Sequence, residues 1–188
     1  MQATSTVQPA QDTGDKRAPM AAAPMKYLPD GSVDWGNMWD SFCVLAKEGG
    51  PPHRGTMLHG QDDADPESAG YRFAVAEIAR GIGEVSGLEA YPAKPGWLAV
   101  RCASPGMARW LQEAILEENV NAASEGALLF VPVGETFSLK GEIKNVVTAV
   151  AKTTHYWTDH VPDDVKRLLS LEQRFDGWKE RLAKWLGR

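Results

Sequence analysis

A stiff basic segment spans residues 49–56, where the sequence reads Gly-Gly-Pro-Pro-His-Arg-Gly-Thr. Glycines allow a backbone to approach a ligand closely, and prolines restrict the conformations of the chain. His53 and Arg54 supply hydrogen-bond donors suited to a phosphate or a carboxylate. The segment is therefore a candidate anion site. The alternative interpretation is a stiff connector whose arginine pairs with a surface carboxylate.

A second candidate is a row of polar residues on a helix predicted from Glu142 to about His160. The members of the row recur every three or four positions and so share one face: Lys144, Thr148, Lys152, His155 and Asp159. Asn145 flanks the row. Two ammonium groups and an imidazole can hold an anionic ligand, with His155 as an acid or base near neutral pH. The alternative is a solvated helix face on which Asp159 pairs with His155.

The four histidines form two short clusters, His53 with His59 and His155 with His160. Residues five apart on a helix point about 140° away from each other, so the second pair converges only if the helix ends between them. The chain has no HExxH motif and no paired cysteine ligands. The sequence therefore predicts neither a metal site nor a bound cofactor.

Support for other familiar chemistry is weak. The sequence has no GxSxG elbow, no GxGxxG fingerprint and no GxxxxGK[ST] loop. Of the two cysteines, Cys43 lies among apolar neighbours that give no reason for a reactive thiolate, and Cys102 also lies in an apolar stretch. Two reduced, buried thiols are favoured over a single disulfide. Whether the chain is an enzyme stays open.

Charge and hydropathy exclude two classes of partner. The formal net charge is −5, with 20 Lys and Arg against 25 Asp and Glu, which argues against a nucleic-acid binder that works through a cationic field. No run of 18 or more apolar residues occurs, so no transmembrane segment is predicted. Polar residues interrupt the N-terminal stretch where a secretory signal needs an apolar core. These features indicate a soluble, cytoplasmic protein.

Composition divides the chain into three parts. Residues 1–24 contain no aromatic residue and are predicted to be a disordered tail, with Met1 and Met25 both possible translation starts. Residues 25–161 are predicted to form one α+β domain. Residues 162–188 are predicted to form an amphipathic C-terminal helix.

Periodicity and turn residues predict the elements of the domain. An aromatic stripe that starts at Trp35 predicts a first helix, which the Gly49–Pro52 stretch ends. A second helix is expected from a cap at Asp65 and Pro66 to Gly87. The next stretch predicts a hairpin, with a strand over 88–91, a turn over 92–96 and a strand over 97–102.

The same helix-and-hairpin order then recurs. Ser104 and Pro105 predict the start of another helix, and a second hairpin is expected over 120–133 with its turn at 124–126. This order predicts a two-layer α+β domain with an antiparallel sheet of about four strands and helices on one face. The repeated order also makes an internal duplication plausible.

The C-terminal helix carries the most specific pattern in the chain. Its apolar residues recur at heptad spacing and form one seam: Leu168, Leu171, Phe175, Trp178, Leu182 and Trp185. Such a seam requires cover, which its own domain, a second copy, another protein or a membrane surface can provide. Interleaved acidic residues disfavour the membrane.

Two functions follow from these features. The favoured hypothesis is a non-catalytic binding or assembly module that docks on itself or on a larger complex through the seam. The alternative is a small enzyme or carrier that binds an anionic metabolite between the 49–56 segment and the helix face of Lys144, Lys152 and His155. The partner is thus a protein, a second copy or a small anionic ligand.

Overall fold

A computed structural model describes residues 25–38 and 55–169 of the chain. Its regular elements follow in the order α3 (Ala69–Ser86), β1 (Ala90–Lys94), β2 (Trp97–Arg101), α4 (Pro105–Glu117), β3 (Ala123–Glu125), β4 (Leu128–Pro132), the π-helical turn η1 (Leu139–Ile143) and α5 (Lys144–Asp159). Residues 163–169 are helical as well. The predicted tail over 1–24 lies outside the described residues, as do most of the first helix and most of the C-terminal helix.

Capping residues define the two helices that precede the hairpins. Helix α4 starts as predicted, with Ser104 as N-cap accepting a hydrogen bond from the Met107 amide and with Pro105 in the first turn. Helix α3 starts three residues later than the predicted Pro66. Its N-cap is Ser68, and Asp65 instead accepts backbone bonds within the turn before it. Gly87 ends α3 with a φ of 70°.

The four strands form one antiparallel sheet in the order β1-β2-β4-β3. The predicted α+β class and four-stranded antiparallel sheet are therefore confirmed. The central contact joins the second strands of the two hairpins, with Ala99 opposite Phe130. The order of the strands could not be predicted from the sequence, because each hairpin signal determines only which two strands pair with each other.

Both hairpins differ from their predicted bounds. In the second, Ser124 and Glu125 belong to strand β3, so the predicted turn at 124–126 is wrong. The first hairpin differs in the same way. Strand β1 continues through Pro92 to Lys94, so the predicted turn over 92–96 is wrong and the connection is Pro95-Gly96. Proline has no N–H group to donate to a neighbouring strand. It is tolerated in β1 because β1 is an edge strand, and one of its sides has no neighbouring strand. Gly96 supports the tight connection with a φ of 83°.

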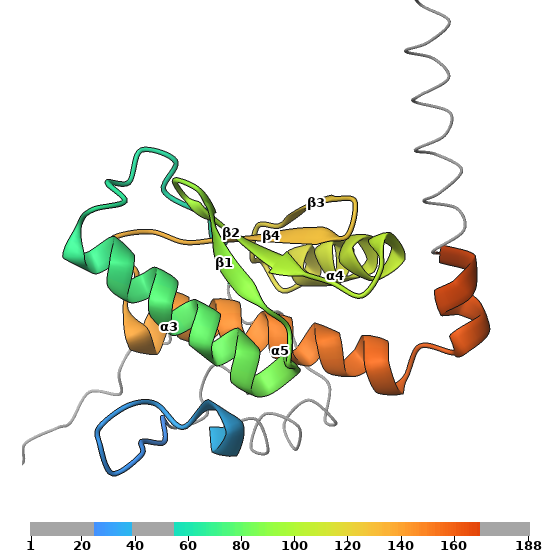
Figure 1. Ribbon diagram of the computed structural model, residues 1–188, viewed down its shortest axis with the longest axis horizontal. Helices are drawn as coiled ribbons and strands as arrows, with labels where there is room; N and C mark the ends of the chain where they lie inside the picture. Colours follow the sequence, from blue (N-terminus) through green and yellow to red (C-terminus); the bar gives the residue numbers. More distant parts are fainter. Residues whose placement is uncertain (1–24, 39–54, 170–188) are drawn as a thin grey trace, which may run out of the picture.

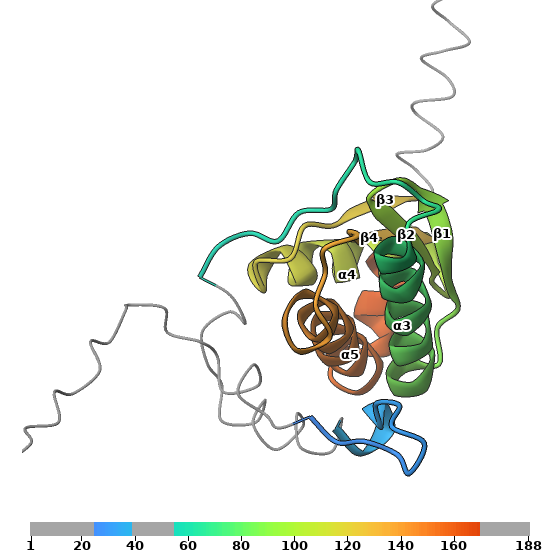
Figure 2. The same cartoon turned by 90° about the vertical axis from the view of Figure 1, so that its left-hand side faces the viewer.

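The three long helices all lie on one side of the sheet (Figure 1). Helix α3 packs on β1, helix α4 packs on β3 and β4, and α5 packs on both helices. Figure 2 shows α5 between α3 and α4, on the side away from the strands. Helices α3 and α5 lie close together at Gly81, where an added Cβ would lie 2.8 Å from Val147 Cγ2.

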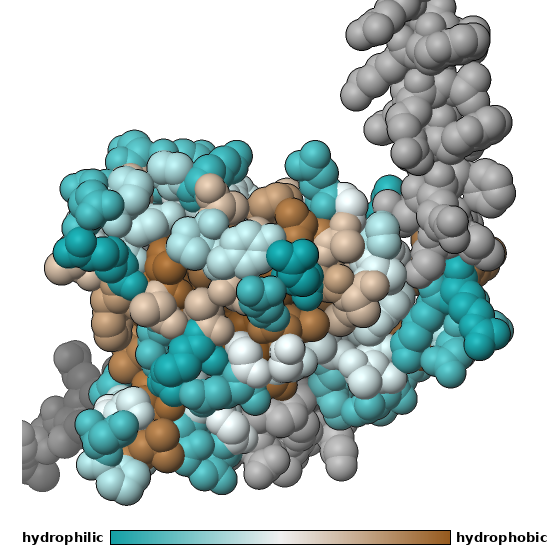
Figure 3. Space-filling view, in the orientation of Figure 1, coloured by the Kyte–Doolittle hydropathy of each residue, from teal (hydrophilic) through white to brown (hydrophobic). Residues whose placement is uncertain are grey.

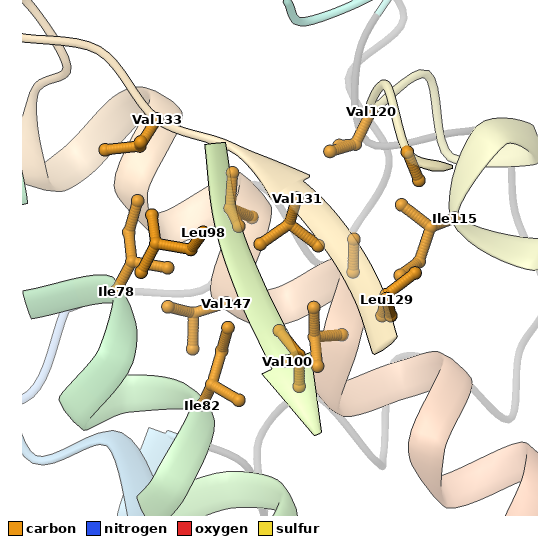
Figure 4. Packing of buried hydrophobic residues seen from close by; sticks show 14 of the residues in the cluster. Ile78, Ile82, Leu98, Val100, Ile115, Val120, Leu129, Val131, Val133 and Val147 are labelled. Carbon is orange, nitrogen blue, oxygen red and sulfur yellow. The ribbon is translucent and has the colours of Figure 1, made fainter. Parts of the chain in front are cut away.

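One apolar core fills the space between the sheet and the helices. Figure 4 shows the inward residues of the two central strands, Leu98, Val100, Leu129 and Val131, facing branched side chains of the helices. These four strand residues are fully buried. Alternation along a strand sends the residues between them to the opposite face of the sheet, which no described helix covers.

The two hairpins have equivalent positions in this layout. Each follows a helix, places its first strand at an edge of the sheet and its second strand at the centre. Helix α3 contacts edge strand β1, and helix α4 contacts edge strand β3. The duplication itself stays a prediction. Among the described residues, no helix has the length and apolar character needed to cross a membrane.

Candidate functional site

The first two members of the polar row on α5 are buried rather than solvated. Lys144 is 4% exposed and Thr148 is 1% exposed, although both were predicted to lie on a surface face. The reason is the position of α5 between two other helices, which covers more of its circumference than one apolar stripe. Thr148 satisfies its hydroxyl within the helix by donating to the Lys144 carbonyl at 2.6 Å.

Lys144 is the first residue of α5 and directly follows the π-helical turn η1. Burial lowers the pKa of its ammonium group, because the charged form loses hydration. Asn145, the next residue, is half-buried. The row therefore begins inside the protein, where it has little access to a dissolved anion.

Lys152 forms an ion pair with Glu118, the C-cap residue of α4. The Lys152 side chain is 19% exposed and that of Glu118 is 10% exposed. Because charges so far from water are costly unless paired, each side chain depends on the other. The pair links α4 to α5, which is a structural role that the sequence did not indicate.

The exposed end of α5 brings two histidines together. The helix ends at Asp159, and His160 is its C-cap residue. The helix ends between His155 and His160, as their convergence requires, and their ring centroids are 5.3 Å apart. His155 Nδ1 lies 2.9 Å from Asp159 Oδ2, which confirms the predicted pair.

The other histidine cluster is placed only in part. His53 and Arg54 lie outside the described residues, so their proximity to α5 stays a prediction. His59 is exposed, with its Nδ1 3.3 Å from the Asn121 side-chain nitrogen. Within residues 25–38 and 55–169, no group of three or more His, Cys, Asp or Glu side chains is arranged to hold a metal ion.

Cys102 has the properties of a structural thiol. It is buried and not part of a disulfide, and burial raises the pKa of its thiol to about 12. Since the thiolate is the nucleophile, such a side chain is unreactive near neutral pH. Cys43 lies outside the described residues.

The start of the C-terminal helix shows part of the predicted seam. Leu168 is 56% exposed and Val165 is 39% exposed. Lys166 anchors this helix to α5 by donating to the Thr158 carbonyl at 2.9 Å, and its ammonium group lies 6.0 Å from the centre of the Trp157 ring. The other predicted seam residues lie outside the described residues: Leu171, Phe175, Trp178, Leu182 and Trp185.

The open face of the sheet is a surface that sequence reasoning missed. A row of paired residues crosses all four strands on this face: Tyr91, Ala99, Phe130 and Ala123. Trp97 lies next to the row and donates its indole N–H to Asp62 at 2.8 Å. Figure 3 shows hydrophobic patches between hydrophilic side chains on the side of the molecule that is seen in Figure 1.

A shallow pocket of about 460 Å³ lies on this open face. Its lining combines aromatic, small and charged residues from both hairpins: Ala93, Lys94, Trp97, Ala123, Ser124, Glu125 and Phe130. The Lys94 ammonium group lies 5.7 Å from the centre of the Trp97 ring. An available signal was the alternation of each strand, which assigns Trp97 and Phe130 to the face opposite Leu98 and Leu129.

Comparison with known proteins yields no relative. No protein-family model matches the chain, no curated protein matches it, and no solved structure matches it. The function therefore has to be argued from the surfaces described above.

Proposed function

We propose that the chain is a non-catalytic binding or assembly module that docks on a protein through the seam of its C-terminal helix, in a cytoplasmic setting. The observation that carries this proposal is the exposure of Leu168, at 56%, where the seam enters the described residues. The remaining seam residues follow it at the same spacing.

Energetics support docking of the whole seam. Burial of one large apolar side chain contributes about 1.5–3 kcal/mol of free energy. Six such residues on one stripe therefore strongly favour binding of the stripe to another surface. Ordering the helix and losing free tumbling offset part of that gain. A protein surface is the favoured cover, because acidic residues alternate with the basic ones beside the seam.

The anion-binding alternative has less support from the geometry. It requires Lys144, Lys152 and His155 to present free charge to a ligand. Lys144 is buried, Lys152 is paired with Glu118 and His155 lies beside Asp159. A metabolite would have to replace contacts that the protein already makes within itself.

Substitution in the seam tests the docking role. The double variant Phe175→Glu with Trp178→Glu places two charges on the apolar stripe, and we expect it to lose whichever stoichiometric protein contact the wild type forms. Native mass spectrometry and light scattering on purified full-length protein measure self-association. Tagged purification, followed by mass determination of the complex, measures any other partner.

Lys179→Glu is the matched control, because it changes the net charge by the same amount at a position that the heptad spacing assigns to the polar side of the predicted helix. It should retain the contact. A wild-type chain that stays monomeric at high concentration and retains no stoichiometric partner would falsify the docking role.

A further inference from the structure

The open face of the sheet has the composition of an interface. An antiparallel sheet that faces water on one side usually alternates to polar residues there. Here the central row carries Tyr91 and Phe130 with Ala99 between them, and Trp97 lies beside it. Ala99 is only 1% exposed, so the neighbouring side chains already close over the middle of this face. The result is a partly exposed surface of aromatic and small apolar residues, bordered by charged side chains such as Arg101, whose guanidinium lies 5.6 Å from the centre of the Tyr91 ring. An apolar surface with a charged rim is a feature of binding sites.

The shape of this face fits a helix. Four strands about 4.8 Å apart make a surface roughly 15 Å wide, while a helix with its side chains is about 10–12 Å across. The pocket on this face draws its lining from all four strands, where Ala93 and Ala123 leave room above the aromatic rings. Lys94 and Glu125 also line it, so charges of both signs are available to an amphipathic helix.

From these surfaces we propose that the open sheet face of one copy receives the C-terminal segment 170–188 of a second copy. This inference rests on the proposed function and names both the partner and its receiving surface. Each copy would supply one segment and one face, so two identical contacts close a symmetric dimer.

Charge favours this occupant. Segment 170–188 carries five Lys and Arg against three Asp and Glu, a net charge of +2. Because the whole chain is −5, the remaining residues carry −7. A basic apolar segment is thus attracted to the acidic body of another copy, and the attraction also speeds association.

The path of the chain favours a second copy over the same one. The helix over 163–169 is anchored to α5 through Lys166, beside Trp157, whose ring lies 5.7 Å from that of Trp110 on α4. This anchor is on the helix side of the sheet, opposite the open face. No proline follows Pro162, and the apolar spacing continues to Trp185. The pattern predicts that the helix continues from this anchored start on the helix side.

Two complementary variants test the exchange. Phe130→Glu breaks the receiving face but keeps the segment, and Trp178→Glu breaks the segment but keeps the face. We expect each full-length variant alone to dissociate at concentrations at least about 100-fold higher than the wild-type dimer does, because a buried charge then sits in both contacts. An equimolar mixture retains one intact segment-to-face contact and should form a mixed dimer, seen by native mass spectrometry of differently tagged copies.

Controls separate this inference from the general docking role. Phe73→Glu changes an exposed aromatic residue on α3, and it should leave the dimer intact. Thermal melts establish that each variant folds, and Tyr91→Glu on edge strand β1 serves as the second face variant if Phe130→Glu does not. A mixture that forms no mixed dimer overturns the inference. If Trp178→Glu releases a different protein while Phe130→Glu retains it, docking stands and the sheet face is not its receptor.

Discussion

Helix α5 and the open face of the sheet distribute their residues in opposite ways. Helix α5 carries lysines and threonines, yet Lys144, Thr148 and Thr153 are buried. The sheet face carries Tyr91 and Phe130, yet no described helix covers it. The difference shows that a side chain's environment depends on which elements pack around it. A polar residue can be internal where its partners lie inside, and an aromatic residue can be partly exposed where no described helix covers its strand.

The strongest test of the buried side is Glu118→Ala. The change leaves the Lys152 ammonium group without its carboxylate in a mostly buried position, and we expect the free energy of unfolding to fall by about 3–5 kcal/mol. Urea denaturation measures it. Glu113→Ala is the control, since its pair with Arg109 is more than half exposed and should contribute less than about 0.5 kcal/mol. Equal losses for the two variants would contradict the contrast.

A second test compares neighbours on one strand. Leu129 is fully buried beneath the sheet, while Leu128 is half-buried on the opposite face. Leu129→Ala should cost about 3 kcal/mol of unfolding free energy, and Leu128→Ala about 1 kcal/mol, because only the first opens a cavity in the core. Measurement at low protein concentration isolates the stability of the single chain. If the order of the two losses were reversed, the assignment of the faces would be wrong.

The smallest effect is a pH dependence. Burial lowers the pKa of Lys144, so between its folded and unfolded pKa values the unfolded state binds more protons and stability rises with pH. Burial raises the pKa of Cys102 to about 12, so its contribution falls as pH rises from about 9 towards 12. Relative to wild type, Cys102→Ala should therefore gain about 1 kcal/mol per pH unit above pH 9.

Denaturation of Lys144→Met and Cys102→Ala over pH 7–11 separates the two slopes. Relative to wild type, the stability of Lys144→Met should fall as the pH rises, while that of Cys102→Ala should increase. Parallel profiles for wild type and both variants would mean that neither group is desolvated in the folded chain.

Local signals predicted the fold better than they predicted the surfaces. Ser104 with Pro105, Gly87 and the alternation of 97–101 describe caps and strands that depend on near neighbours in sequence, and they identified α4, the end of α3 and β2. Pairing of β2 with β4 depends on residues about thirty positions apart, for which no local signal exists.

The candidate sites show the same limit more clearly. The spacing of Lys144 and Lys152 correctly placed them on one helix, but their burial follows from α3 and α4 packing around α5. Pairing of Lys152 with Glu118 spans 34 positions. The alternation within each strand could have identified the individual residues of the open sheet face. Its continuity across both hairpins required the strand order.

The central pairing of β2 with β4 also affects how the chain is made. During synthesis β1 and β2 emerge first, and the inner edge of β2 has no partner until residues 128–132 have left the ribosome. An unpaired strand edge is a template for aggregation. The interval in which α4 and β3 are translated is thus a period of risk, in which a bound chaperone or rapid formation of α4 would protect the nascent chain.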